Sequence, residues 1–76
     1  MAQTISVVSE EYIDGNWVRV TVRGIKFNGE YDVDIFYAEQ GCSYAWRTTE
    51  REHVTCKRVS TINKKLAAKG FQCKVA

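Results

Sequence analysis

Residues 17–37 read WVRVTVRGIKFNGEYDVDIFY and contain the pattern that decides the fold. Apolar and polar side chains alternate on both sides of Asn28-Gly29, which is typical of two β-strands with one buried face. Asn and Gly both tolerate the positive φ angles of a type I′ turn, so this dipeptide predicts a tight hairpin. Counting outward from the turn pairs Phe27 with Glu30, Arg23 with Asp34, Val22 with Ile35 and Val20 with Tyr37. Apolar residues therefore meet on one face of the hairpin and charged residues meet on the other.

Two further turn signals extend the sheet. Asp14-Gly15 sets Ser9 opposite Val20 and Val7 opposite Val22, and a shift of the turn to Gly15-Asn16 keeps the same faces together. We interpret Gln40-Gly41 as a third turn, which sets Tyr37 opposite Tyr44, Ile35 opposite Trp46 and Asp34 opposite Arg47. Because a one-residue slip moves every side chain to the wrong face, agreement among the three turns favours a four-stranded antiparallel meander near residues 4–13, 16–27, 30–39 and 42–48.

The buried face of this meander needs a cover, and the second half of the chain offers a helix. The expected inward-facing residues are Ile5, Val7, Val18, Val20, Val22, Val33, Ile35, Tyr37, Tyr44 and Trp46. Thr49 and Glu52 have the spacing of a capping box, so the helix could begin there. The β-branched residues between His53 and Val59 favour the alternative, in which the fourth strand runs on and the helix starts at Ser60. The helix is expected to end before Gly70.

The last residues complete the expected fold. Phe71, Cys73 and Val75 alternate as a short final strand, which could pair with the first or the fourth strand; we prefer the first, because that edge would otherwise stay open. The fold class is therefore α+β: a four-stranded antiparallel β-meander with one C-terminal helix packed on one face and a short final edge strand, in the order ββββαβ. The length of 76 residues indicates a single small domain, 1–76.

Composition and charge limit the function classes. Residues 1–46 carry three bases and seven acids, whereas residues 47–76 carry eight bases and two acids. The three cysteines are odd in number and lack CxxC spacing, so we expect reduced thiols, a cytoplasmic location and no metal site. No apolar run is long enough to span a bilayer, and the N-terminus lacks the plan of a signal peptide, so we expect no membrane partner.

Few residues could carry catalysis. His53 and Cys56 are three residues apart and could share a helix face, but a surface histidine beside a half-buried thiol is the simpler interpretation. Asp32 and Asp34 lie two apart on the outward face of one strand, where flanking arginines would lower the pKa of Asp34, the wrong direction for an acid catalyst. The sequence therefore predicts no enzyme, no catalytic residue and no cofactor.

Two surfaces remain as candidate binding sites. The outward sheet face mixes aromatic, arginine and acidic side chains, which are Tyr12, Trp17, Arg19, Arg23, Asp34, Phe36 and Arg47. The outer stripe of the helix is basic and consists of Lys57, Arg58, Lys64 and Lys65.

These surfaces favour a small non-enzymatic module that binds a protein. Its size and plan look like those of small phage-encoded proteins that bind and block host enzymes, although no motif carries the likeness, so an inhibitor or adaptor of a host protein or complex is the leading hypothesis. The alternative is a nucleic-acid-binding domain that uses the basic helix or the arginine and aromatic sheet face. A homodimer that buries the outward face is a further alternative.

Overall fold

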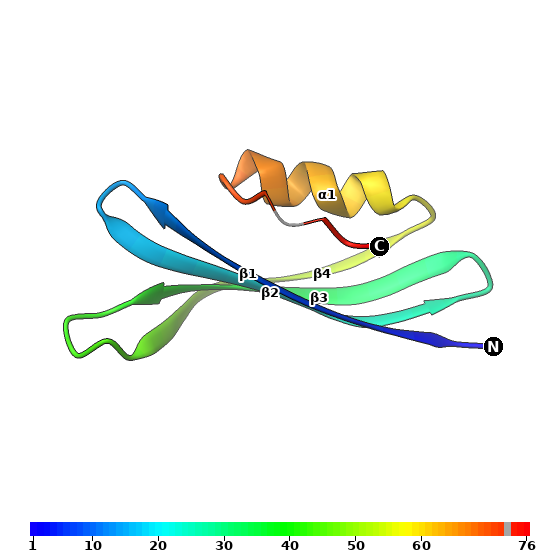
Figure 1. Cartoon of the computed structure of the whole chain (residues 1–76). Coiled ribbons are helices and arrows are strands. Elements are labelled where there is room, and N and C mark those ends of the chain that lie inside the picture. The colour runs from blue at the N-terminus through cyan, green and yellow to red at the C-terminus, as the bar shows by residue number, and fades with distance from the viewer. Residues whose placement is uncertain (73) are drawn as a thin grey trace.

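The protein is a four-stranded antiparallel sheet covered on one face by a single helix (Figure 1). The computed structural model describes residues 1–72 and 74–76. Strands β1 (Gln3–Ile13), β2 (Asn16–Phe27), β3 (Glu30–Gln40) and β4 (Trp46–Cys56) follow one another across the sheet, and α1 (Val59–Ala68) comes after them. The prediction of a small α+β fold, with a β-meander followed by a helix, is confirmed.

The first two hairpins have the predicted register. Val7 pairs with Val22, and Val22 pairs with Ile35 on its other side. Both turns place a non-glycine residue and then a glycine at positive φ: 51° and 80° at Asp14-Gly15, and 53° and 73° at Asn28-Gly29. These are the angles of a type I′ turn, whose twist matches that of the strands it joins.

The third hairpin differs from the prediction. Gln40 pairs with Trp46, so the connection has five residues, 41–45, in place of a two-residue turn at Gln40-Gly41. Backbone hydrogen bonds close this loop, from Gly41 N to Ala45 O at 2.9 Å and from Tyr44 N to Gly41 O at 3.0 Å, with Tyr44 at φ 63°. As a result, the predicted pairs of the third hairpin are wrong: Tyr37 lies opposite Glu50, Ile35 opposite Glu52 and Asp34 opposite His53.

Strand β4 runs on to Cys56, as the alternative interpretation held, and the helix begins at Val59. The capping box is therefore wrong, because Thr49 and Glu52 both lie in β4. Thr49 falls at an irregularity of the β3–β4 ladder, where its Oγ1 donates a hydrogen bond to Tyr37 O at 3.3 Å. Arg58 stands at the N-cap and makes no side-chain capping bond.

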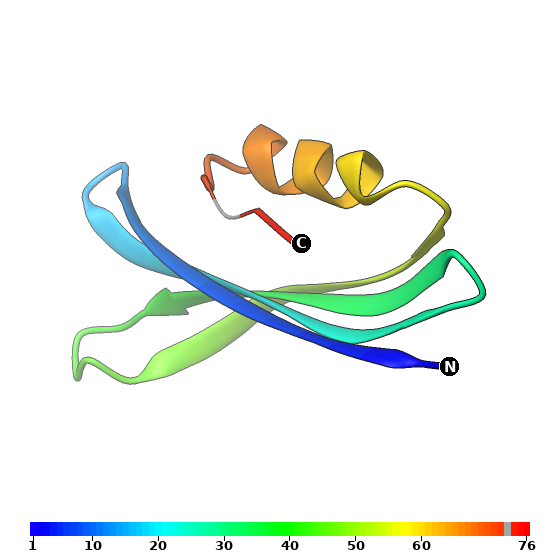
Figure 2. The same ribbon diagram turned by 45° about the vertical axis from the view of Figure 1, so that its right-hand side comes forward.

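Gly70 ends the helix as predicted. Its φ is 91°, and its N–H donates to Ala67 O at 3.0 Å while Phe71 N donates to Leu66 O at 3.0 Å. This pair of bonds forms a Schellman motif, which needs a left-handed residue just after the helix. The motif directs the C-terminal tail back along the helix (Figure 2).

The core lies between the sheet and α1. Tyr44, which is 79% exposed, and Trp46 lie outside it, contrary to prediction, because the longer third connection changed their register. Val7 and Val18 are partly buried against it. The buried residues are Ile5, Val20, Val22, Tyr31, Val33, Ile35, Tyr37, Val54, Ile62, Leu66, Phe71 and Val75.

The described tail residues pack on the core but do not pair with the sheet as a strand. Phe71 and Val75 are buried, and Val75 N donates to Asn63 Oδ1 at 2.9 Å. Residues 71, 72 and 74–76 form no strand, so the expected final strand is not found there, and Cys73 lies outside the described residues. Aromatic and aliphatic burial, rather than strand pairing, holds these described tail residues, and β1 is an edge strand of the sheet.

Candidate functional site: the open face of the sheet

Helix α1 and the tail cover one face of the sheet, and the ribbon views show the other face uncovered (Figures 1 and 2). We call this second surface the open face. Because side chains alternate across a strand, the open face takes every second residue of each strand, and in β4 the alternation shifts by one residue at the irregularity near Thr49. Its main members are Val8, Glu10, Tyr12, Trp17, Arg19, Thr21, Arg23, Asp32, Asp34, Phe36, Trp46, Arg51 and His53.

Aromatic rings gather at the end of the open face near the β1–β2 turn. Tyr12 and Trp17 are cross-strand partners whose rings meet edge to face, with centroids 5.5 Å apart. The guanidinium of Arg19 lies 4.0 Å from the ring centroid of Trp46. We call these four residues the aromatic end.

Arg19 is fixed from two sides. Its Nε and Nη2 donate to Glu10 Oε1 at 3.1 and 2.8 Å, while Trp46 covers its planar face. Holding a guanidinium in this way reduces the side-chain entropy that a later contact would remove. Tyr12 and Trp17 remain 62% and 45% exposed. The aromatic end is therefore an ordered patch with accessible ring surface.

Charged groups occupy the middle of the open face. His53 Nδ1 lies 2.9 Å from Asp34 Oδ1, and Nε2 of the same ring lies 2.7 Å from Asp32 Oδ1. The hydrogen bond with Asp34, reinforced by the charges of both aspartates, raises the pKa of His53. Next to this group, the guanidinium of Arg51 lies 5.3 Å from the ring centroid of Phe36.

The pKa of Asp34 is lowered, as the sequence predicted, but the main cause differs. The hydrogen bond with His53 has the largest effect, and the charges of Arg51 and Arg23 add to it. Arg47 takes no part, because it pairs with Glu39 and forms an ion pair with that carboxylate. Arg47 was placed on the open face by the wrong third turn, and it shares the other side of the sheet with Glu39.

The remaining predicted members of the sheet surface do share the open face: they are Tyr12, Trp17, Arg19, Arg23, Asp34 and Phe36. Sequence reasoning missed Trp46, Arg51 and His53, which β4 adds to it. Continuing the fourth strand through the β-branched stretch after Thr48 would have found Arg51 and His53, since they then alternate outward. Placing Trp46 on the open face required the length of the loop before it, and the sequence has no comparable signal for that length.

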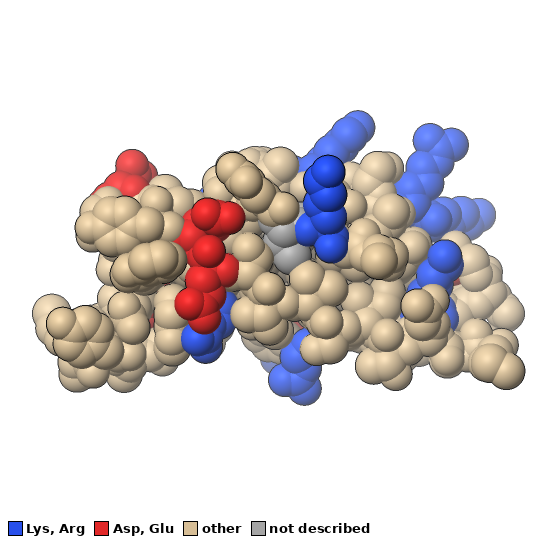
Figure 3. All heavy atoms as spheres, in the orientation of Figure 1, with Lys and Arg blue, Asp and Glu red and all other residues tan. Residues whose placement is uncertain are grey.

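The basic helix stripe is only partly assembled. Lys57 and Arg58 precede α1, in the connection from β4. Lys65 Nζ lies 3.2 Å from Glu52 Oε2, an ion pair that ties the helix to β4. Lys64 of the helix and Lys74 of the tail both line one groove. Figure 3 shows lysine and arginine side chains over the helix side of the molecule.

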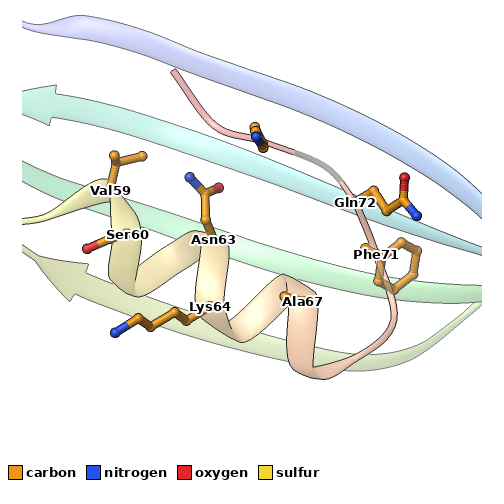
Figure 4. A pocket seen from close by; sticks show the side chains of 8 residues that line it. Val59, Ser60, Asn63, Lys64, Ala67, Phe71 and Gln72 are labelled. Carbon is orange, nitrogen blue, oxygen red and sulfur yellow. The ribbon is translucent and has the colours of Figure 1, made fainter.

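This groove runs between α1 and the tail and has a volume of about 640 Å³. Val59 and Asn63 point from the helix toward the tail, and Phe71 closes the far end (Figure 4). The surface is mainly apolar, and Lys64 and Lys74 are among its lining residues.

The structure separates the residues considered for nucleophilic catalysis. His53 and Cys56 are three residues apart on a strand, so they lie on opposite faces of β4. Cys56 packs against the core, and its Sγ lies 3.4 Å from Arg58 O. Across residues 1–72 and 74–76, no cluster of three or more His, Cys, Asp or Glu residues is placed to hold a metal ion.

The only helix within the described ranges, α1, has ten residues and is too short to cross a membrane. Comparisons of the chain with protein-family models, with curated proteins and with solved structures found no match.

Proposed function

We propose that this protein is a non-enzymatic protein-binding module that docks a partner through the open face of its sheet. The observation that carries the proposal is the aromatic end, where Tyr12 and Trp17 stay exposed beside an Arg19 that is already held by Trp46 and Glu10. Tyr, Trp and Arg are the residue types that contribute most at protein interfaces. A module of this kind acts as an inhibitor or adaptor, since it changes its partner by occupying a surface.

The open face also defines the chemistry of the partner. Its aromatic end favours an apolar patch, and its centre presents carboxylates beside the cations Arg23 and Arg51 and beside His53, whose pKa is raised by the hydrogen bond with Asp34. A complementary surface has an apolar centre bordered by charges of both signs, which fix the orientation of docking more than its strength. A reducing cytoplasm suits the module, because Cys42 is an exposed free thiol.

Affinity capture from the native host, with and without nuclease, tests the proposal. We expect a saturable protein partner that survives nuclease and is lost with Trp17→Ala or Tyr12→Ala, since each removes exposed ring area at the proposed interface. Hot-spot truncations of this type cost about 2 kcal/mol or more in binding. Lys64→Ala on the helix side is the matched control and should leave capture unchanged. Equal capture by all three variants would contradict the proposal.

A nucleic-acid-binding role is the second candidate, and one observation favours it. Lys57, Arg58, Lys64 and Lys74 make no ion pair with any carboxylate in the described part of the chain. Such cations can release counterions from a phosphate backbone, and affinity then falls steeply with salt. Lys65 and Lys69 add less, because Glu52 and Glu50 already pair with them. Binding to mixed DNA and RNA that weakens along a salt series, and that fails in Lys64→Ala, would favour this role over protein binding.

A further inference from the structure

The two edges of the sheet are protected to different degrees. On β4, charged residues crowd the edge at Arg47, Glu50, Arg51 and Glu52, and the ladder is irregular there. Charges and bulges of this kind prevent an edge from pairing with another strand. The sequence of β1 is QTISVVSEEYI, eleven residues without lysine, arginine or proline, and its only charges are Glu10 and Glu11 near one end. Strand β1 is therefore a long edge with few of the usual safeguards.

The described residues of the tail, 71, 72 and 74–76, make no backbone hydrogen bond to this edge. Residues 71, 72 and 74–76 form no strand beside β1, although Phe71 and Val75 are buried against the core. Every second residue of an antiparallel edge strand directs its N–H and C=O away from the sheet. Figure 2 shows β1 crossing in front of the other strands, with the helix and tail above it.

We propose that β1 pairs antiparallel with β1 of a second copy of this chain, in a register centred on Val8. This interaction uses the edge of the sheet and does not depend on the proposed function of the open face. Val8 is the middle residue of Gln3–Ile13, so this register pairs all eleven residues of both strands. It sets Val8 opposite Val8 of the second copy, Val7 opposite Ser9, Ser6 opposite Glu10, Ile5 opposite Glu11, Thr4 opposite Tyr12 and Gln3 opposite Ile13.

Charge disfavours registers centred on the glutamate end of the strand, and full-length pairing favours the centre at Val8. Glu10 meets a serine and Glu11 meets an isoleucine, so no two carboxylates face each other. Moving the centre to Glu10 or Glu11 would place like charges directly opposite, which destabilises a strand pair. As the partner strand, β1 of the second copy fits this edge better than β4 of the second copy does. Strand β4 presents alternating acids and bases and has an irregular ladder.

The pairing has a structural consequence. The two-fold axis passes through the paired strands perpendicular to the sheet, so both helices lie on the same side and the two open faces join into one surface. The result is a continuous eight-stranded sheet, with four strands from each copy.

Disulfide trapping tests the register directly. In this pairing, the two Val8 Cα atoms lie about 5.5 Å apart, within the span that a disulfide accepts. Val8→Cys should form an 8–8 linked dimer under mild oxidation, identified by peptide mapping so that native cysteines do not confuse the result. Ser6→Cys is the matched control: both positions are exposed on β1, but the two Ser6 residues are four residues apart along the strands, about 13 Å. Equal yields from the two variants would overturn the register.

Sedimentation equilibrium tests the interface itself. We expect the unmodified chain to show a concentration-dependent dimer and Val8→Lys to lose it, because two lysines would then face each other across the axis. Thr21→Lys provides the control, since Thr21 pairs with Val8 on the open face but lies on the inner strand β2. It should keep an edge-paired dimer and disrupt one that stacks through the open faces. Two results would overturn the proposal. One is a chain that stays monomeric at about 200 μM, a concentration at which weak protein pairs associate. The other is a dimer that is lost in Thr21→Lys.

Discussion

The imidazole of His53 lies directly across the β3–β4 pair from Asp34, with Nδ1 2.9 Å from Oδ1. The same ring reaches Asp32 through Nε2 at 2.7 Å. When both ring nitrogens carry hydrogens, each can donate to a carboxylate. This arrangement therefore favours the imidazolium form in the folded protein.

Stability should consequently depend on the protonation of His53. Its pKa is raised in the folded state, chiefly by the hydrogen bond with Asp34, so the group stabilises the fold fully below its ordinary pKa of 6.5. That contribution is lost as the pH rises through the folded-state pKa. The expected result is a weak fall in unfolding free energy above pH 6.5, measured by urea denaturation.

The variant Asp34→Asn isolates this effect. It removes the main cause of the shift, so an NMR titration of His53 should give a lower pKa than in the unmodified chain. Glu30→Gln, at the first residue of β3, is the control and should leave the titration unchanged, because Glu30 does not contribute to the pKa shift of His53. Identical titrations in the Asp34→Asn and unmodified chains would show that the hydrogen bond does not form in solution.

Gly24 is required by the close approach of β2 and β3. A Cβ built there would lie 2.2 Å from Asp32 O and 2.6 Å from Val33 Cα, and backbone atoms cannot give way as a flexible side chain does. Gly24→Ala should lower the free energy of unfolding by about 1–3 kcal/mol, the usual range for overpacking. Gly41→Ala, whose nearest contact is 3.8 Å, should change it little in the same denaturation experiment. Equal effects would mean that the strands separate more easily than the structure indicates.

Burial, rather than ion pairing, should hold α1 on the sheet. Leu66 is fully buried, so Leu66→Ala should cost about 2–5 kcal/mol of stability. The ion pair between Lys65 and Glu52 is partly exposed at both ends, so Lys65→Ala should cost less than about 1 kcal/mol. Thermal unfolding of the two variants compares their losses of stability. A larger loss in Lys65→Ala than in Leu66→Ala would contradict the prediction that burial holds the helix.

The sequence predicted the fold where local chemistry specifies backbone geometry. Asp14-Gly15 and Asn28-Gly29 tolerate positive φ, and the structure uses them with the predicted registers. The helix end at Gly70 follows the same rule. In the third hairpin, the positive φ falls at Tyr44, a residue type with no preference for that conformation, so nothing in the sequence marked the five-residue loop.

The longer loop, together with the fourth strand continuing past Thr48, explains the mistakes at the candidate site. With the loop lengthened, Trp46 moves from the expected core to the open face, and Arg47 moves to the side of Glu39. His53 then takes the place opposite Asp34 that Arg47 was expected to occupy. The tail could not be predicted for a different reason: alternation of apolar residues specifies burial equally well for a strand and for an irregular segment packed on a core.

The central claim is that the open face binds a partner, and the two tryptophans of the chain provide the most direct test of it. Trp17 and Trp46 both lie at the aromatic end, so a chain labelled with 5-fluorotryptophan has two ¹⁹F reporters there. We predict that adding the unlabelled captured partner shifts or broadens both resonances in a saturable way. If both resonances stay unchanged while the partner is bound, docking occurs elsewhere and the claim is contradicted.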